Sequence, residues 1–457
     1  MVKNVIVRCR NILTHGAYGE FLKGSFSVFL TKAGGACLSF GLSVILARTL
    51  GAESYGVYAF AFAVSSLLLV PAHSGVPRLV VREMAKAWSV KDTSLIKGLR
   101  RWADRAIGVY AALILLVGLL LLVQPPGRAM FESPAVLLLA LVGTSIAAFT
   151  SARAGALRGQ RQVVRAEVPQ SILRPAILSA ALLGWITFDP GSPLTADTAM
   201  VLRIVTEVLL VVAATVLLAR ARPVAVESPG SARTFPAGWR RAVIPLSMIS
   251  GLQFINGQAD LLVLGWLRSD EEVGVYRVVV SGAGLVAFGL HALNEVLRPY
   301  FSSLYADGAK AELQKLVTLS ARLITLAAVP PVLAFLFFGD ALLGWIFGTE
   351  YSAGYMALVI LGVGQLVNAA MGSVGALLSM TGHENDTLRG NMVAATANLV
   401  LNMVLVPSYG IEGAAVATAA TFAISNFYLY RMVRLRLGME STLLGTRRAG
   451  ADDEKGS

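Results

Sequence analysis

Twelve long apolar runs constrain the fold of this chain more than any other feature of its sequence. We place membrane-spanning helices at 24–47, 56–76, 105–124, 134–152, 169–187, 197–219, 242–266, 273–293, 319–338, 354–379, 387–407 and 411–432. About 20 apolar residues are needed to cross a hydrocarbon core roughly 30 Å thick. The composition, 56% hydrophobic and 14% charged, agrees with such a chain. Because the runs are long and uniformly apolar, we expect an all-α polytopic membrane protein and not a barrel.

The net charge of +12 has a topological explanation. Basic residues gather in alternate loops, whereas the loops between them are nearly bare of Lys and Arg. By the positive-inside rule, this pattern predicts a multi-pass protein of the cytoplasmic (inner) membrane with both termini in the cytoplasm. No basic groove with interleaved aromatic residues is visible, so we expect no nucleic-acid partner. The richest basic segment lies between the second and third helices and contains Arg78, Arg82, Lys86, Lys91, Lys97, Arg100, Arg101 and Arg105.

Neither the cysteines nor the histidines indicate a metal site. The two cysteines and four histidines show no metal-ligand spacing. The P-loop pattern of ATP-driven proteins is also absent from the sequence, so we expect no metal, no ATP site and no other cofactor. Residues 1–23 are interrupted by Lys and Arg and do not read as a cleavable signal.

A short sequence occurs twice, 218 residues apart. Gly56-Val57-Tyr58 and Gly274-Val275-Tyr276 each follow a long apolar helix and an acidic exterior turn. We therefore expect two six-helix lobes, 24–219 and 242–433, between a cytoplasmic arm (1–23) and a cytoplasmic tail (434–457), with a polar cytoplasmic linker at 220–241. Six helices are an even number, so the lobes form a parallel repeat and can rock about a central cleft, with each Gly-containing hairpin turning at the exterior. Chance similarity of a three-residue match is the alternative.

Several motifs in order resemble one transporter family. They are "ARTLGAESYGVYAF", "ALRGQRQ", "GVYRVVVSG", "LRPYFSSLYADG", "FGTEYSAGYMALVIL" and "VPSYGIEGAAVATA". Together they are similar to the Wzx-type polysaccharide and O-antigen flippases of the multidrug/oligosaccharidyl-lipid/polysaccharide (MOP) superfamily, which implies a MATE-like fold. The resemblance further implies translocation of undecaprenyl-pyrophosphate-linked oligosaccharide from the inner to the outer leaflet. It also implies polysaccharide polymerase and glycosyltransferase partners. We expect a protein that works as a monomer and, because the exterior loops are short, not an enzyme.

A polar head group crossing the bilayer requires polar side chains inside apolar helices. Lys32 lies about two turns inside the first helix and is the clearest cationic candidate. Arg78 and Arg82 could receive a pyrophosphate at the cytoplasmic mouth, although a solvated loop face is an equal alternative. Arg277, at the exterior start of the eighth helix, could act in release.

The seventh and eighth helices carry further candidates. Gln253, Asn256, Gln258 and Asp260 lie in the seventh helix, and Asn256 and Asp260 share a face. Asn294, Glu295 and Arg298 recur at helical spacing near the cytoplasmic end of the eighth helix, where an interfacial ion pair is an equal alternative.

Other intramembrane polar residues read as structural. Arg203 and Glu207 are i, i+4 neighbours that can neutralise each other, and Arg174 precedes a proline in the fifth helix. We interpret Asn368, Asn391, Asn398, Asn402 and Asn426 as interhelical hydrogen-bond partners.

The energy source is left open by the sequence. Outward movement of a pyrophosphate is favoured by about 2.3 kcal/mol per charge per 100 mV of membrane potential. Asp260 or Glu295 could instead couple a proton or Na⁺. A multidrug antiporter of organic cations is the nearest alternative function, and a lipid II flippase or a membrane polymerase or ligase is a more distant one.

Overall fold

The computed structural model describes residues 17–123, 133–188, 191, 193–221 and 236–445. Every regular element in these ranges is helical. The predicted cytoplasmic arm up to residue 16, residues 222–235 of the predicted linker and the predicted tail from residue 446 lie outside them. The elements are α2 (Ala17–Leu68), η1 (Pro71–Gly75), α3 (Val76–Ser89), α4 (Thr93–Val123), α6 (Pro134–Gly159), α7 (Val163–Val168), η2 (Pro169–Leu173), α8 (Arg174–Phe188), α9 (Ala196–Arg220), α10 (Pro236–Leu267), α11 (Asp270–Ala306), α12 (Lys310–Ile346), η3 (Thr349–Gly354), α13 (Tyr355–Met371), α14 (Val374–Met380) and α15 (Glu384–Leu437).

The two longest helices each fold back on themselves at a glycine. In α2 the chain turns at Gly51, whose φ is 75°, and in α15 at Gly410, whose φ is 52°. The hydroxyl groups of Ser43 and Tyr55 lie 3.0 Å apart across the first turn. In a straight helix residues 12 apart would be separated by roughly 18 Å. Both helices are therefore hairpins that contain two predicted spans each, since glycine adopts positive φ without strain.

The prediction of a polytopic helical membrane protein is confirmed. Nine helices within the described residues are long and apolar enough to cross a membrane. Helix α10 covers the predicted seventh span but is not among the nine, because polar residues interrupt its middle. Most helices extend several residues beyond the predicted spans; α11, for example, runs to Ala306.

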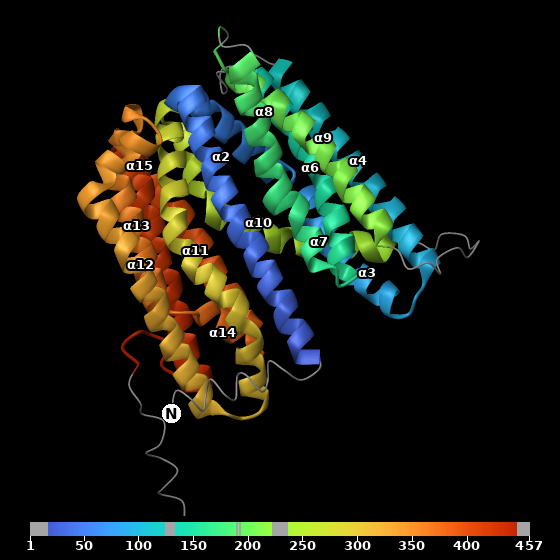
Figure 1. Cartoon of the computed structure of the whole chain (residues 1–457), viewed down its shortest axis with the longest axis vertical. Coiled ribbons are helices and arrows are strands. Elements are labelled where there is room, and N and C mark those ends of the chain that lie inside the picture. Colours follow the sequence, from blue (N-terminus) through green and yellow to red (C-terminus); the bar gives the residue numbers. More distant parts are fainter. Residues whose placement is uncertain (1–16, 124–132, 189–190, 192, 222–235, 446–457) are drawn as a thin grey trace, which may run out of the picture.

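The helices form two bundles (Figure 1). The first bundle comprises α2, α3, α4 and α6 to α9, and the second comprises α11 to α15. Helix α2 lies at the boundary, where it packs on α6 and α8 of its own bundle and on α11 of the second. Helix α10 likewise contacts η1 and α3 of the first bundle and α15 of the second. The exact lobe limits of 24–219 and 242–433 remain predictions.

The repeated glycines lie where the two bundles meet. A Cβ atom on Gly56 would stand 1.7 Å from the carbonyl oxygen of Asp270, and one on Gly274 would stand 1.9 Å from that of Ala52. Asp270 is 218 residues after Ala52, so the two contacts are equivalent under the offset of the repeat. As expected, each glycine follows the turn of its hairpin: the first turn is at Gly51, and α11 begins at Asp270, four residues before Gly274. Gly56 and Gly274 permit close backbone approach.

Candidate functional site

Contacts between the bundles gather at one end, which we call the outer end because the charge pattern assigns it to the exterior. The hydroxyl of the fully buried Tyr351 donates to the carbonyl of Ala47 at 2.9 Å. The guanidinium of Arg48 donates to the carbonyl oxygen of Ile346 at 2.7 Å and also to that of Trp345, at the end of α12. Together with the two glycine contacts, these bonds hold the outer end closed.

Helix α10 connects the bundles further toward the other end. Its Trp239 is 3% exposed and packs edge-to-face against Trp102 of α4, with ring centroids 5.3 Å apart. A Cβ atom on Gly75 of η1 would meet the hydroxyl of Ser247 at 2.1 Å. Three residues later, in the first turn of α3, the guanidinium of Arg78 donates to the side-chain carbonyl of Gln253. Arg78 therefore lies at the boundary between the bundles, where it was predicted to meet a head group.

The other predicted cations occupy different surroundings. Lys32 of α2 is half-buried and lies three residues before Gly35, where a Cβ atom would stand 2.6 Å from the carbonyl oxygen of Ser171 in η2. Arg82 is exposed and pairs at 2.8 Å with the adjacent Glu83, which agrees with the alternative of a solvated face. Arg277 is half-buried near the start of α11, whereas Arg298 is exposed on the same helix.

Asp260 lies in a polar cluster inside the second bundle. It is 7% exposed, and its carboxylate accepts hydrogen bonds from the hydroxyl of Tyr276 at 2.6 Å and from that of Thr418 at 3.2 Å. Asn256, one turn earlier, donates from its amide to the carbonyl of Asn391 at 3.1 Å. The predicted shared face of Asn256 and Asp260 therefore contacts α15, within the second bundle.

Two asparagines extend this cluster, and both have a side-chain oxygen without a hydrogen-bond partner. Asn398 donates to Thr418 at 3.4 Å, and Asn402 donates to the backbone carbonyl of Asn398 at 2.8 Å. Both residues are at most 2% exposed, and the Oδ1 atom of each is buried and unbonded. Buried polar atoms without partners are uncommon and mark places where an ion or water can bind. Asp260, Thr418 and Asn398 are joined in one chain of hydrogen-bonding groups, and oxygen atoms of such groups are the ligands that hard cations prefer.

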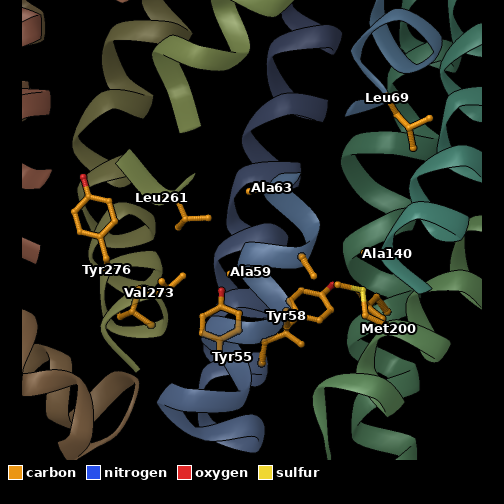
Figure 2. Close-up of a cluster of buried hydrophobic side chains, with 14 of the residues drawn as sticks. Tyr55, Tyr58, Ala59, Ala63, Leu69, Ala140, Met200, Leu261, Val273 and Tyr276 are labelled. Carbon is orange, nitrogen blue, oxygen red and sulfur yellow. The ribbon is translucent and has the colours of Figure 1, made fainter. Parts of the chain in front are cut away.

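The repeated tyrosines reach one charged partner in each half. Tyr276 donates to Asp260, and its counterpart Tyr58 accepts a hydrogen bond of 3.4 Å from Arg203. Figure 2 shows Tyr58 directed toward the helices that carry Ala140 and Met200, whereas Tyr276 lies on the other side of α2. Sequence analysis found the repeated motif as a mark of equivalent hairpins but assigned no partner to its tyrosines.

A second buried polar network lies in the first bundle. Glu207 is fully buried and pairs with Arg174 at 2.8 Å, whereas Arg203 stacks on the ring of Phe62 at 3.8 Å. In place of the predicted pairing of Arg203 with Glu207, Glu207 pairs with Arg174 of α8, and Arg203 contacts aromatic side chains.

This network continues through two π-helical turns that each begin with proline. His73 of η1 lies 3.4 Å from the hydroxyl of Ser151, and Gln170 of η2 donates to that hydroxyl at 3.2 Å. Sequence reasoning missed this group; π-helical turns are frequent at functional sites but leave no simple periodic signal.

The remaining candidates add little defined geometry. Gln258 and Asn294 are half-buried, and the Oδ1 atom of Asn294 is buried without a partner. The side chain of Glu295 lies outside the described part of the structure. Among the described residues, no group of three His, Cys, Asp or Glu side chains could hold a metal ion.

Two sequence relatives have names that refer to glycan or capsular polysaccharide biosynthesis. A probable low-salt glycan biosynthesis flippase of Haloferax volcanii, Agl15, is 25% identical over 167 residues, which cover 36% of this chain and 35% of the relative. The capsular polysaccharide biosynthesis protein CapF of Staphylococcus aureus is 27% identical over 193 residues, which cover 42% of this chain and 49% of the relative. The chain thus spans half or less of the length of these curated relatives.

Solved structures match over nearly the whole chain. An inward-facing multidrug resistance transporter of the MATE family and MOP superfamily has a TM-score of 0.71 at 13% identity, covering 91% of this chain and 98% of that one. The lipid II flippase MurJ in an inward closed conformation has a TM-score of 0.69 at 12% identity, covering 90% and 87%. Residues 21–305 of this chain match the sequence model of the family described as "Polysaccharide biosynthesis protein". The chain therefore belongs to the polysaccharide biosynthesis protein family and has the twelve-helix fold of the MOP superfamily transporters.

Proposed function

We propose that this protein is a flippase that moves undecaprenyl-pyrophosphate-linked oligosaccharide from the inner to the outer leaflet of the bacterial cytoplasmic membrane. The lipid tail stays in the bilayer during this movement, while the head group passes between the two bundles. The flippase performs no covalent chemistry. It would receive its substrate from glycosyltransferases and deliver it to a polymerase.

The observation that carries the proposal is the closure of the bundles at one end. Two equivalent backbone contacts, at Gly56 and Gly274, and the hydrogen bond from Tyr351 to Ala47 join the bundles at the outer end. A pair of repeated bundles hinged in this way can open alternately to either side of the membrane. Family membership and the names of the relatives favour a glycan-carrying lipid as the transported molecule.

Cations near the boundary suit an anionic head group. Lys32 lies on α2, the helix at the boundary, and Arg78 reaches across to Gln253. A pyrophosphate could replace Gln253 as the partner of Arg78, since charge-assisted bonds to phosphate are stronger than bonds to a neutral amide. Outward transport of about two negative charges would release about 4.6 kcal/mol per 100 mV.

The cluster around Asp260 is the proposed coupling site. Its carboxylate, the hydroxyl of Thr418 and the unbonded Oδ1 atom of Asn398 can together bind a Na⁺ ion, and the carboxylate alone can carry a proton. Tyr276 connects this site to the contact at Gly274, two residues earlier on α11. Ion binding and closure of the outer end therefore act on the same turn of helix.

The transport proposal is tested in proteoliposomes that contain a labelled undecaprenyl-pyrophosphate oligosaccharide, with an impermeant enzyme outside and an imposed membrane potential. We expect the initial rate of head-group appearance to fall about tenfold or more for Lys32→Ala and Arg78→Gln, as for loss of a charge-assisted contact. Arg82→Gln is the matched control, since Arg82 pairs locally with Glu83. Absence of lipid movement together with ion-coupled efflux of organic cations would identify a multidrug antiporter instead.

The coupling proposal has a readout that does not require transport. The melting temperature of purified protein is measured in Na⁺ and in K⁺, at several pH values. A ligand at about 100 times its dissociation constant stabilises the folded state by about 2.7 kcal/mol. We expect Na⁺ to raise the melting temperature of the wild type and not that of Asp260→Asn, with Asp340→Asn, an exposed carboxylate of α12, as control. A response to Na⁺ that survives in Asp260→Asn contradicts the assignment.

A further inference from the structure

A chain of hydroxyl groups crosses from one bundle to the other, just inside the outer end. Ser43 of α2 donates to the hydroxyl of Ser281 of α11 at 3.0 Å, and Ser281 donates to the backbone carbonyl of Arg277 at 2.9 Å. The hydroxyl of Tyr55 lies 3.0 Å from that of Ser43. Because each hydroxyl has one hydrogen and Ser43 gives its own to Ser281, Tyr55 is the donor to Ser43. The chain of bonds therefore runs in one direction, from Tyr55 to the carbonyl of Arg277.

The close contact between α2 and α11 ends at this pair of serines. On the outer side of the pair, Ala47 is fully buried, and a Cβ atom on Gly274 would stand 1.9 Å from a backbone oxygen. Residues three or four apart share a helix face. One turn inward on the same faces, Ser39 is exposed, Leu285 is 45% exposed, and a Cβ atom on Gly284 would meet nothing within 4 Å. The two helices thus touch on the outer side of the serine pair and no longer cover each other on its inner side.

The side chain of Arg277 places a positive charge next to this pair. It lies one turn from Ser281, nearer the outer end, and is half-buried. Within the described ranges, no carboxylate pairs with its guanidinium. Arginines inside membrane spans are costly and mark the paths of ions and charged substrates. An anion that passed the serine pair on its way out would therefore meet a cation without a counter-ion.

A hydrogen-bond acceptor can break this chain, whereas a donor cannot. Ser281 is half-buried, so the pair can be reached from its inner side. A phosphate oxygen only accepts hydrogen bonds, and it can bind Ser43 only by taking the hydrogen that now goes to Ser281. That exchange is favourable, since a bond to a charged acceptor is stronger than a bond between two neutral hydroxyls. A sugar hydroxyl can donate to the free lone pairs of the serine oxygens and leave the chain intact.

We propose that Ser43 binds the phosphate of the carried lipid and thereby releases the outer end. A phosphate oxygen that takes the hydrogen of Ser43 removes the bond to α11 and brings the anion beside the turn that carries Arg277. The inference rests on the proposed function, because the phosphate belongs to a lipid that moves between the bundles. It adds the hydroxyl that recognises this phosphate, and the reason why an anionic head group opens the outer end.

The test combines two measurements on the intact protein in detergent. One is the affinity for undecaprenyl pyrophosphate, and the other is the distance between spin labels at Gly191 and Asp340, near the outer ends of the two bundles. Ser43→Ala and Ser281→Ala each remove the bond between the bundles, so each should raise the ratio of open to closed molecules without ligand about fivefold. Only Ser43→Ala removes the donor, so it should weaken binding about tenfold, whereas Ser281→Ala should bind at least as tightly as the wild type. Ser43→Thr keeps the hydroxyl and should restore both quantities.

The controls separate this inference from the proposed function. Ser39→Ala removes an exposed hydroxyl one turn away on the same helix and should change neither quantity, and undecaprenol, which lacks phosphate, should not open the wild type. Equal binding by Ser43→Ala and the wild type, or equal loss in Ser43→Ala and Ser281→Ala, would overturn the inference and leave the flippase proposal standing. No binding of undecaprenyl pyrophosphate to the wild type would contradict both. Opening by an equal concentration of inorganic pyrophosphate would overturn the assignment to a phosphate carried on a lipid.

Discussion

A methyl group at either repeated glycine should open the outer end. In Gly56→Ala the new Cβ atom would lie 1.7 Å from the carbonyl oxygen of Asp270, and in Gly274→Ala it would lie 1.9 Å from that of Ala52. Both obstacles are backbone atoms, which cannot rotate away as a side chain can. The two helices must therefore separate by more than about 1 Å before an ordinary contact distance is reached.

The size of the effect follows from the cost of overpacking. Inserting a methyl group into a close contact typically costs about 1–3 kcal/mol, and the cost here falls only on the state in which the outer end is closed. The ratio of open to closed molecules should therefore rise about 5- to 150-fold. The effects of the two variants should not simply add in the double variant, because a Cβ atom on either glycine would also stand 3.0 Å from the backbone nitrogen of the other, so one separation of the helices relieves both contacts.

The assay is the distance between spin labels at Gly191 and Asp340, which lie near the outer ends of the first and second bundles, in a variant without native cysteines. We expect both alanine variants to shift the distribution to longer distances. Gly257→Ala on α10 is the control, because a Cβ atom there would meet nothing within 4 Å. Identical distributions for Gly56→Ala, Gly257→Ala and the wild type would refute the idea that the glycine contact holds this end closed.

Two further predictions concern charged side chains. Arg174→Gln leaves Glu207 buried without its cation, so it should lower the free energy of unfolding by about 3–5 kcal/mol. Adding Glu207→Gln should restore most of the lost melting temperature. Equal destabilisation by the single and double variants would contradict this account. Arg48→Gln removes the guanidinium that binds the backbone carbonyls at the end of α12. It should lengthen the distance between the two spin labels at the outer end without lowering the melting temperature. An unchanged distance would mean that Arg48 does not hold the bundles together.

The long apolar runs were sufficient to predict the helices, whereas the topology that the charges indicate stays a prediction. The runs of apolar residues are long, and the polar linker interrupts them clearly, so the existence of each span could be predicted from the sequence. The residue at which the chain turns was harder to predict, because the same short segment contains two glycines, Gly51 and Gly56. Only the backbone shows that Gly51 takes positive φ while Gly56 is helical and touches the other half.

The polar residues were predicted less well, because pairing depends on contacts between helices. Asp260 was singled out correctly as a buried carboxylate, yet its partners Tyr276 and Thr418 are 16 and 158 residues away. Glu207 has an arginine at helical spacing, but Arg174 of another helix is its partner. Spacing along one helix cannot reveal which side chain a neighbouring helix presents.

The glycine turns within α2 and α15 also bear on how the protein is made. With almost no polar loop between their two halves, each pair of spans would leave the translocon together, as a unit that has already paired. The geometry of Gly51 and Gly410 would then be needed during synthesis, before the bundles exist. A bulky residue at either glycine would reduce the amount of protein inserted into the membrane, and its molecules would be degraded as nascent chains.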